Sequence, residues 1–186
     1  MLALAFAAAL FGASLPPPLE PAARGQQQCY GYDRLRKLCG AMASYAPGGD
    51  GLIANTATVA LSPVLPIAMT TTTAVRIKEG RVCGRIEAAD LQAASFLVDG
   101  QPAAAKDAEM LRGQVARAYA PQLGHEVCTR FETAEDHLMA RAFIDGQAHP
   151  ELDQRVIWVA PSEGYKVAQN AFSLQQLKQA PATTRH

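Results

Sequence analysis

The sequence has no excess of charge of either sign. Its 186 residues include 17 Lys and Arg and 17 Asp and Glu, which cancel at pH 7. A nucleic-acid backbone or an anionic membrane surface is usually bound through a basic patch, and the sequence contains no block of basic residues. The charge balance therefore predicts that nucleic acid is not a partner.

Histidine and cysteine motifs that bind metals are also missing. The four histidines, His125, His137, His149 and His186, lie far apart along the chain, whereas histidine ligands of zinc often recur within a few residues. No Cys-x-x-Cys motif occurs, and Ser162 lacks the leading glycine of a nucleophile elbow. We therefore predict no metal, no cofactor and no recognisable catalytic motif.

No hydrophobic run reaches the about 20 residues that a membrane-spanning helix needs. The shorter apolar stretch at the start of the chain is typical of a signal-peptide core. We predict a signal peptide over residues 1–14, a flexible linker over 15–28, one domain over 29–172 and a disordered tail over 173–186. The protein would then be periplasmic or secreted, with no integral membrane span in the mature chain. The alternative is that the apolar N-terminus is buried or disordered.

The sequence contains one pattern of residues that occurs twice. Residues 81–102 read RVCGRIEAADLQAASFLVDGQP, and residues 127–147 read VCTRFETAEDHLMARAFIDGQ. Each copy predicts a strand with a cysteine, a polar connection, and a second strand that ends in an Asp-Gly-Gln turn. The interpretation is two similar β-hairpins at about 82–102 and 127–147, and the alternative is a chance likeness between two hairpins with common turn residues.

The repeat also suggests how the four cysteines pair. An even number of cysteines in an exported chain favours two disulfides. Because Cys83 and Cys128 occupy equivalent positions, we favour a Cys83–Cys128 bond between antiparallel strands, which leaves Cys29 with Cys39. A continuous helix from residue 30 would hold the second pair too far apart, so either the helix begins later or the partners are exchanged.

The remaining periodicities complete an α+β prediction. Apolar residues at helical spacing between Cys29 and Tyr45 indicate an N-terminal helix, and those from Ala105 to Tyr119 indicate a helix between the two hairpins. Strands are expected over 70–78 and 155–160. The predicted fold is a mainly antiparallel sheet built from the two hairpins, with one helix packed across it.

The sequence supports only a general prediction of function. The sequence favours a non-catalytic module that binds another protein or a component of the cell envelope. One alternative is a small secreted hydrolase that uses Glu87, Glu132 and His125, because glycosidases place two carboxylates across a cleft. Each glutamate, however, follows an arginine by two positions, which is typical of solvated ion pairs on a strand face. The other alternative is a structural envelope protein.

Peptide mapping of protein exported from a bacterial host tests the export and pairing predictions together. We expect a mature N-terminus near Ser14 and, in the unreduced sample, a peptide in which Cys83 is bonded to Cys128. An uncleaved N-terminus with four free thiols would contradict both predictions.

Overall fold

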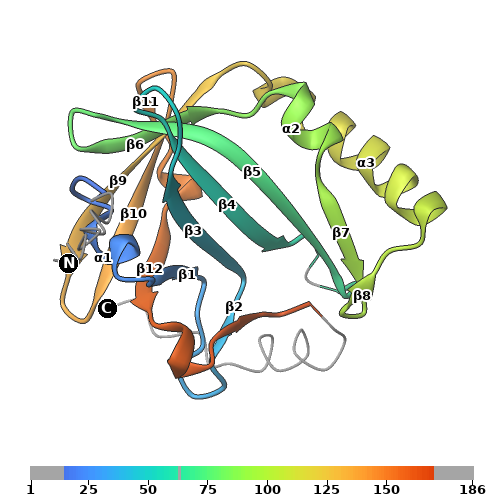
Figure 1. The fold of residues 1–186 in the computed structure, drawn as a ribbon, viewed down its shortest axis with the longest axis horizontal. Helices are drawn as coiled ribbons and strands as arrows, with labels where there is room; N and C mark the ends of the chain where they lie inside the picture. Colours follow the sequence, from blue (N-terminus) through green and yellow to red (C-terminus); the bar gives the residue numbers. More distant parts are fainter. Residues whose placement is uncertain (1–14, 63, 170–186) are drawn as a thin grey trace, which may run out of the picture.

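The computed structural model describes residues 15–62 and 64–169, and its body is a closed antiparallel β-barrel of eight strands (Figure 1). In chain order, each barrel strand pairs with the next, and the last pairs with the first. The strands are β1 (Gln27–Tyr30), β3 (Ala41–Pro47), β4 (Ile53–Ala60), β5 (Ile67–Lys78), β6 (Arg81–Arg85), β9 (Glu126–Ala134), β10 (His137–Ile144) and β12 (Gln154–Val159). The chain therefore runs up and down around one interior.

Short elements surround this barrel. Strand β7 (Ser95–Val98) pairs with the first part of β5. Two further short strands, β8 (Gln101–Pro102) and β11 (Gln147–Ala148), pair antiparallel with β7 and β10, respectively. Strands β2 (Leu38–Cys39) and β13 (Lys166–Val167) form a separate parallel pair. The helices are α1 (Glu20–Ala23), α2 (Ala88–Gln92) and α3 (Ala105–Tyr119), with 3₁₀ turns at Ala120–Gln122, Pro150–Leu152 and Pro161–Glu163.

Alternation along the strands separates an interior face from an exterior face. The threonine run in β5 illustrates this separation. Thr71 and Thr73 line the barrel interior, whereas the hydroxyls of Thr70 and Thr72 lie outside, each 2.8 Å from the hydroxyl of a threonine on β4. One run of identical residues thus contributes polar groups to both faces.

Two-residue turns set the register of several strand pairs. Asp99 and Gly100 between β7 and β8 have φ angles of 51° and 77°, and Asp145 and Gly146 between β10 and β11 have 48° and 83°. Two successive positive φ angles are the signature of the tight hairpin turns that match strand twist, and Asp-Gly is a preferred sequence for them. The structure thus has a turn at each predicted Asp-Gly position.

Different elements cover the two ends of the barrel. At one end, Leu15 and Leu19, which we call the N-terminal plug, pack against Tyr45, Ile53 and Val75. At the other end, α2 and α3, which we call the helical cover, bring Leu91, Leu111 and Val115 onto Met69 and Phe96. The helices lie together on one side of the barrel, next to β7 (Figure 1).

The predicted α+β fold with an N-terminal helix is wrong. Residues between Cys29 and Tyr45 form β1, β2 and β3 instead of a helix. Gly31 and Lys37 both have φ near 54°, which a right-handed helix does not allow, and Asp33 and Leu38 exchange backbone hydrogen bonds across a turn. Leu35, one of the apolar residues at helical spacing in this segment, is 87% exposed.

The idea of two equivalent hairpins is also wrong. In the second copy, residues 127–147, β9 and β10 form a hairpin. In the first copy, 82–102, β6 pairs with β5 and β9, while β7 pairs with β5 and β8. The connection between β6 and β7 forms α2, whose first turn is closed by reciprocal hydrogen bonds between Glu87 and Asp90. The helix predicted between the copies corresponds to α3.

Residues 15–28, expected as a flexible linker, contain the N-terminal plug, α1 and the start of β1. Leu19 has no exposed surface, and Leu15 is 4% exposed. The predicted signal peptide over 1–14 and tail over 173–186 lie outside the described residues. Among the residues described, no helix is both long enough and apolar enough to cross a membrane.

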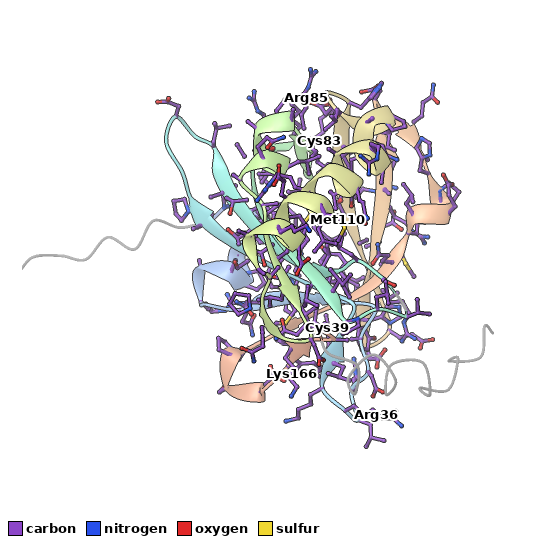
Figure 2. The ribbon with its side chains drawn as sticks, turned by 90° about the vertical axis from the view of Figure 1, so that its right-hand side faces the viewer. Arg36, Cys39, Cys83, Arg85, Met110 and Lys166 are labelled. Atoms are coloured by element: carbon purple, nitrogen blue, oxygen red, sulfur yellow. A yellow bond between two sulfur atoms is a disulfide. The ribbon has the colours of Figure 1, made fainter. Side chains whose placement is uncertain are left out.

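Two disulfides join strands of the barrel to their neighbours. Cys29 is bonded to Cys39, and Cys83 is bonded to Cys128 directly opposite it on β9. The repeated pattern in the sequence favoured the same pairs. Cys83 and Cys39 lie toward opposite ends of the molecule (Figure 2), so the two bonds constrain different parts of the barrel wall.

The two disulfides should contribute unequally to stability. They close chain segments of 10 and 45 residues, for which loop-closure entropy gives about 3 and about 4 kcal/mol. Urea unfolding should therefore show a larger loss of unfolding free energy for the double variant Cys83→Ala/Cys128→Ala than for Cys29→Ala/Cys39→Ala. An equal or reversed order would show that loop entropy is not the dominant contribution.

Candidate functional site

A cavity of about 240 Å³ lies inside the barrel. Its walls come from six barrel strands, with further contacts from the residue after β6 and from α2 and α3. Tyr30, Tyr45, Asn55, Ala57, Val59, Met69, Thr71, Thr73, Val75, Val82, Gly84, Ile86, Leu91, Tyr119, Val127 and Thr129 line it. Small closed barrels of eight strands have an interior that side chains fill or that holds one small ligand. This barrel is only partly filled.

The cavity lies between the two ends of the barrel. Tyr45, Val75 and Val82 contact both the N-terminal plug and the cavity. Met69 and Leu91 contact both the cavity and the core beneath the helical cover. The plug thus packs behind residues of one wall of the cavity, and the helices contribute Leu91 and Tyr119 directly to its lining.

The walls of the cavity differ in polarity. Tyr45, Asn55 and Thr73 are register partners on β3, β4 and β5, so they form one polar row across three neighbouring strands. The wall contributed by β6 and the start of β9 carries Val82 and Val127. The cavity therefore offers a molecule an apolar surface and a restricted strip of hydrogen-bonding groups.

Two of the lining tyrosines are held in place by a buried glutamine. Gln28 has no exposed surface, and its Oε1 accepts hydrogen bonds from the hydroxyls of Tyr30 at 2.6 Å and Tyr45 at 2.7 Å. Its Nε2 is buried and makes no hydrogen bond to any described residue. Since both phenols donate to the same oxygen, their rings are fixed at the edge of the cavity.

Burial also keeps these phenols neutral. Loss of solvent raises the pKa of Tyr45 to about 12 and raises the pKa of Tyr30 well above its ordinary value. Near neutral pH both groups are therefore uncharged hydrogen-bond donors. Within the part of the chain that the structure describes, the lining residues include no Asp, Glu, Lys, Arg or His, so these residues bring no charge to the site.

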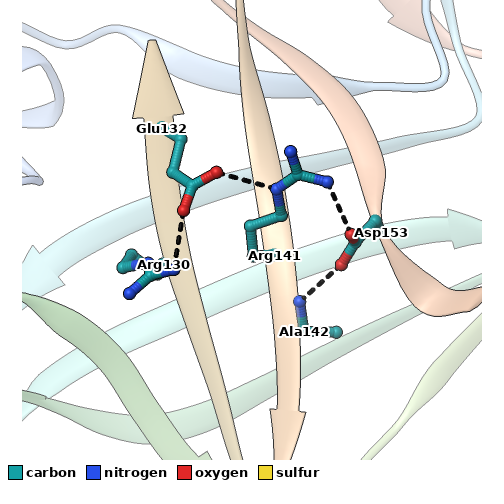
Figure 3. Close-up of polar contacts among 5 residues, drawn as sticks. All are labelled: Arg130, Glu132, Arg141, Ala142 and Asp153. Atoms are coloured by element: carbon teal, nitrogen blue, oxygen red, sulfur yellow. Dashed lines mark hydrogen bonds and ion pairs between the residues drawn. The ribbon is translucent and has the colours of Figure 1, made fainter. Parts of the chain in front are cut away.

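Glu132, one of the predicted catalytic residues, belongs to an ion-pair network on the outside of the barrel (Figure 3). Its carboxylate accepts hydrogen bonds from Arg141 at 2.8 Å and Arg130 at 2.7 Å, and Arg141 also pairs with Asp153 at 2.8 Å. The hydrogen bond from Arg141, followed by that from Arg130, lowers the pKa of Glu132. An ionised, paired carboxylate of this kind suits a structural role better than proton donation.

The other two predicted catalytic residues lie elsewhere. Glu87 caps α2 and lines a surface cleft of about 390 Å³, and neither Glu132 nor His125 lines that cleft. His125 pairs with Asp145, and both side chains are about half exposed. None of the three lines the barrel cavity. The structure therefore does not bring Glu87, Glu132 and His125 together in either space.

The surface cleft next to Glu87 contains charges of both signs. Arg76, Lys78 and Arg85 face Glu126 and Asp90 there, and a hydrogen bond from Lys78 lowers the pKa of Glu126. Glu126 lies close to the sulfurs of Cys83 and Cys128. Because those sulfurs are bonded to each other, they are not available as thiolate ligands of a metal.

Sequence reasoning missed the cavity. Its clearest signal is Asn55, a polar residue in an otherwise apolar and threonine-rich strand, at a position that shares a face with Ile53, Ala57 and Val59. A single amide on an apolar face indicates a specific polar requirement. Thr71 and Thr73 carry no such signal, since threonine suits either face of a strand.

Comparisons of the chain with protein families, with curated proteins and with solved structures find no match. The chemistry of the cavity is therefore the main guide to function. Over residues 15–62 and 64–169, its lining provides hydroxyls, one amide and hydrocarbon, but no histidine, carboxylate or lysine that could activate a nucleophile. This set of groups can bind a molecule and lacks the usual means of transforming one.

Alkaline titration should reveal the buried tyrosines. A phenol whose folded-state pKa is raised stabilises the protein fully below its unfolded pKa near 10, and this stabilisation is lost as pH rises toward the folded value. For Tyr45 the loss between pH 10 and 12 is about 3 kcal/mol. Absorbance at 295 nm should show phenolate formation well above pH 10, and Tyr45→Phe should unfold less steeply with pH. Titration of all five tyrosines near pH 10, with the protein still folded, would contradict this.

Proposed function

We propose that the protein is a non-catalytic binding module that holds one small, largely apolar molecule inside its barrel. The supporting observation is the cavity of about 240 Å³ inside the barrel, whose described lining residues carry no charge. The sequence favoured a protein or envelope component as the partner. The cavity favours a small molecule as the direct ligand, and a protein partner stays a prediction.

The volume of the cavity limits the size of that molecule. An engineered apolar cavity of about 150 Å³ binds benzene, and pockets for drug-sized ligands begin near about 300 Å³. At about 240 Å³, the cavity suits a molecule larger than benzene and smaller than a typical drug. A single aromatic ring with a short side chain, or a medium-length alkyl chain, falls in this range.

A preformed apolar cavity favours such a ligand energetically. Transfer of apolar surface from water contributes about 25 cal/mol per Å² buried, and a rigid site costs little ordering on binding. The Cys83–Cys128 bond supports this rigidity because Gly84 and Val127, the chain neighbours of the two cysteines, line the cavity. We infer that the ligand enters a space that already exists.

The two disulfides support export as the setting for this function. Structural disulfides persist in oxidising compartments, such as the periplasm or the extracellular space. We therefore propose that the protein binds its small molecule outside the cytoplasm, which agrees with the signal peptide predicted over residues 1–14.

A cavity-filling variant tests the proposal. Ala57→Leu places a larger side chain in the cavity, whereas Ala54→Leu makes the same change on the outer face of the same strand. With n-propylbenzene as the probe, wild type and Ala54→Leu should show a saturable rise in melting temperature, because a ligand that binds only the folded state stabilises it. Ala57→Leu should lose that rise.

Either of two results would contradict the proposal. One is that wild type shows no saturable stabilisation by the probe. The other is that Ala57→Leu, folded as judged by its circular dichroism, binds as tightly as Ala54→Leu, which would place the bound molecule outside the barrel.

A further inference from the structure

Asn55 is the one amide side chain among the described residues that line the cavity. Its Oδ1 is buried and forms no hydrogen bond with any described residue. A buried acceptor without a partner is unfavourable in a folded protein and is retained where something else satisfies it. Asn55 as a residue lines the cavity, so a molecule held there is a natural partner for its side-chain amide.

The neighbours of Asn55 do not satisfy it. The Tyr45 hydroxyl, on the register partner in β3, is already donated to Gln28. Thr73, the register partner in β5, also lines the cavity and extends the polar row. Asn55 and Thr73 thus present an amide and a hydroxyl side by side, a combination that can donate and accept hydrogen bonds at the same point.

No charged side chain lies beside Asn55 and Thr73 among the described residues that line the cavity. Arg76 and Lys78 are on β5, the strand of Thr73, and Arg85 is on the next strand, β6, but all three line the outer cleft. An ionised ligand would lose its hydration in the cavity without gaining a counter-ion. A neutral polar group avoids this cost and can pair with the amide.

On these grounds we propose that Asn55 determines ligand specificity, and that the ligand is a neutral molecule whose apolar body ends in a hydroxyl or amide group bound by Asn55 and Thr73. This inference rests on the proposed function and deepens it by naming the chemical class of the ligand. A hydroxyl group can donate to Asn55 Oδ1 while its own oxygen accepts from Thr73. The apolar body then lies against the wall formed by Val82 and Val127.

Three probes of similar size test the inference on the full-length protein: 1-octanol, which is neutral and has a hydroxyl; octanoate, which is ionised at pH 7.5; and n-propylbenzene, which has no hydrogen-bonding group. Dissociation constants are measured by titration calorimetry. Wild type should bind 1-octanol at least tenfold more tightly than octanoate, because only the alcohol avoids an unpaired buried charge.

Substitution at Asn55 supplies the decisive comparison. Asn55→Leu keeps the size of the side chain and removes the amide, so 1-octanol should bind about tenfold more weakly, while n-propylbenzene binds at least as well as in wild type. Thr73→Val, which removes one hydroxyl without changing shape, should weaken 1-octanol in the same direction. Thr72→Val is the matched control, because Thr72 faces outward toward Thr56, and its affinities should equal those of wild type.

The outcomes separate this inference from the proposed function. If wild type and Asn55→Leu bind all three probes alike, or if octanoate binds most tightly, the cavity is a binding site but the assigned ligand class is wrong. If wild type binds none of the probes, the proposed function fails and this inference fails with it. Should Asn55→Leu fold poorly, as shown by lost binding of n-propylbenzene, Thr73→Val against Thr72→Val decides the question, and equal affinity of those two variants for 1-octanol would overturn the inference.

Discussion

The pairing of β1 with β12 is the interaction on which the rest of the structure depends. Strand β1 has only four residues, yet it joins β12 on one side and β3 on the other and thereby closes the barrel. Its alternation serves both faces: Cys29 points outward to its disulfide with Cys39, and Gln28 points inward to the two tyrosines. Without this closure there would be no interior, and the polar row at Asn55 would face water.

The interior is mainly apolar but carries a short polar row formed by Tyr45, Asn55 and Thr73. Most closed barrels of this size can be filled by side chains alone. Here Ala57 and Gly84 occupy positions where larger residues would reduce the space, and at Gly84 a Cβ would lie 2.8 Å from Val75 Cγ1. Close approach of β5 and β6 thus requires a glycine, and the void that remains lies beside an amide that the protein itself does not satisfy.

Local features were predictable from the sequence, whereas closure was not. The Asp-Gly turns, the helix at 105–119 and the strand around 70–78 depend on residues close together in the chain. The β1–β12 pairing joins residues about 130 positions apart, such as Gln28 and Trp158, and no local pattern specifies such a partner. The apolar residues at helical spacing between Cys29 and Tyr45 led to the wrong prediction of a helix, because Gly31 and Lys37 adopt positive φ angles. Among the residues of the candidate site, only Asn55 could have been recognised from the sequence, because it is a polar residue on an apolar strand face.

The N-terminal plug makes the barrel's interior sensitive to its own leading segment. Leu15 and Leu19 occupy the mouth of the barrel ahead of the first strand, and they touch the same residues, Tyr45 and Val75, that border the cavity. Proteolytic trimming past Leu19 would therefore do more than shorten the chain, since it would admit water to Gln28 and its tyrosines. The presence of Leu15 and Leu19 thus decides how far water reaches into this end of the barrel.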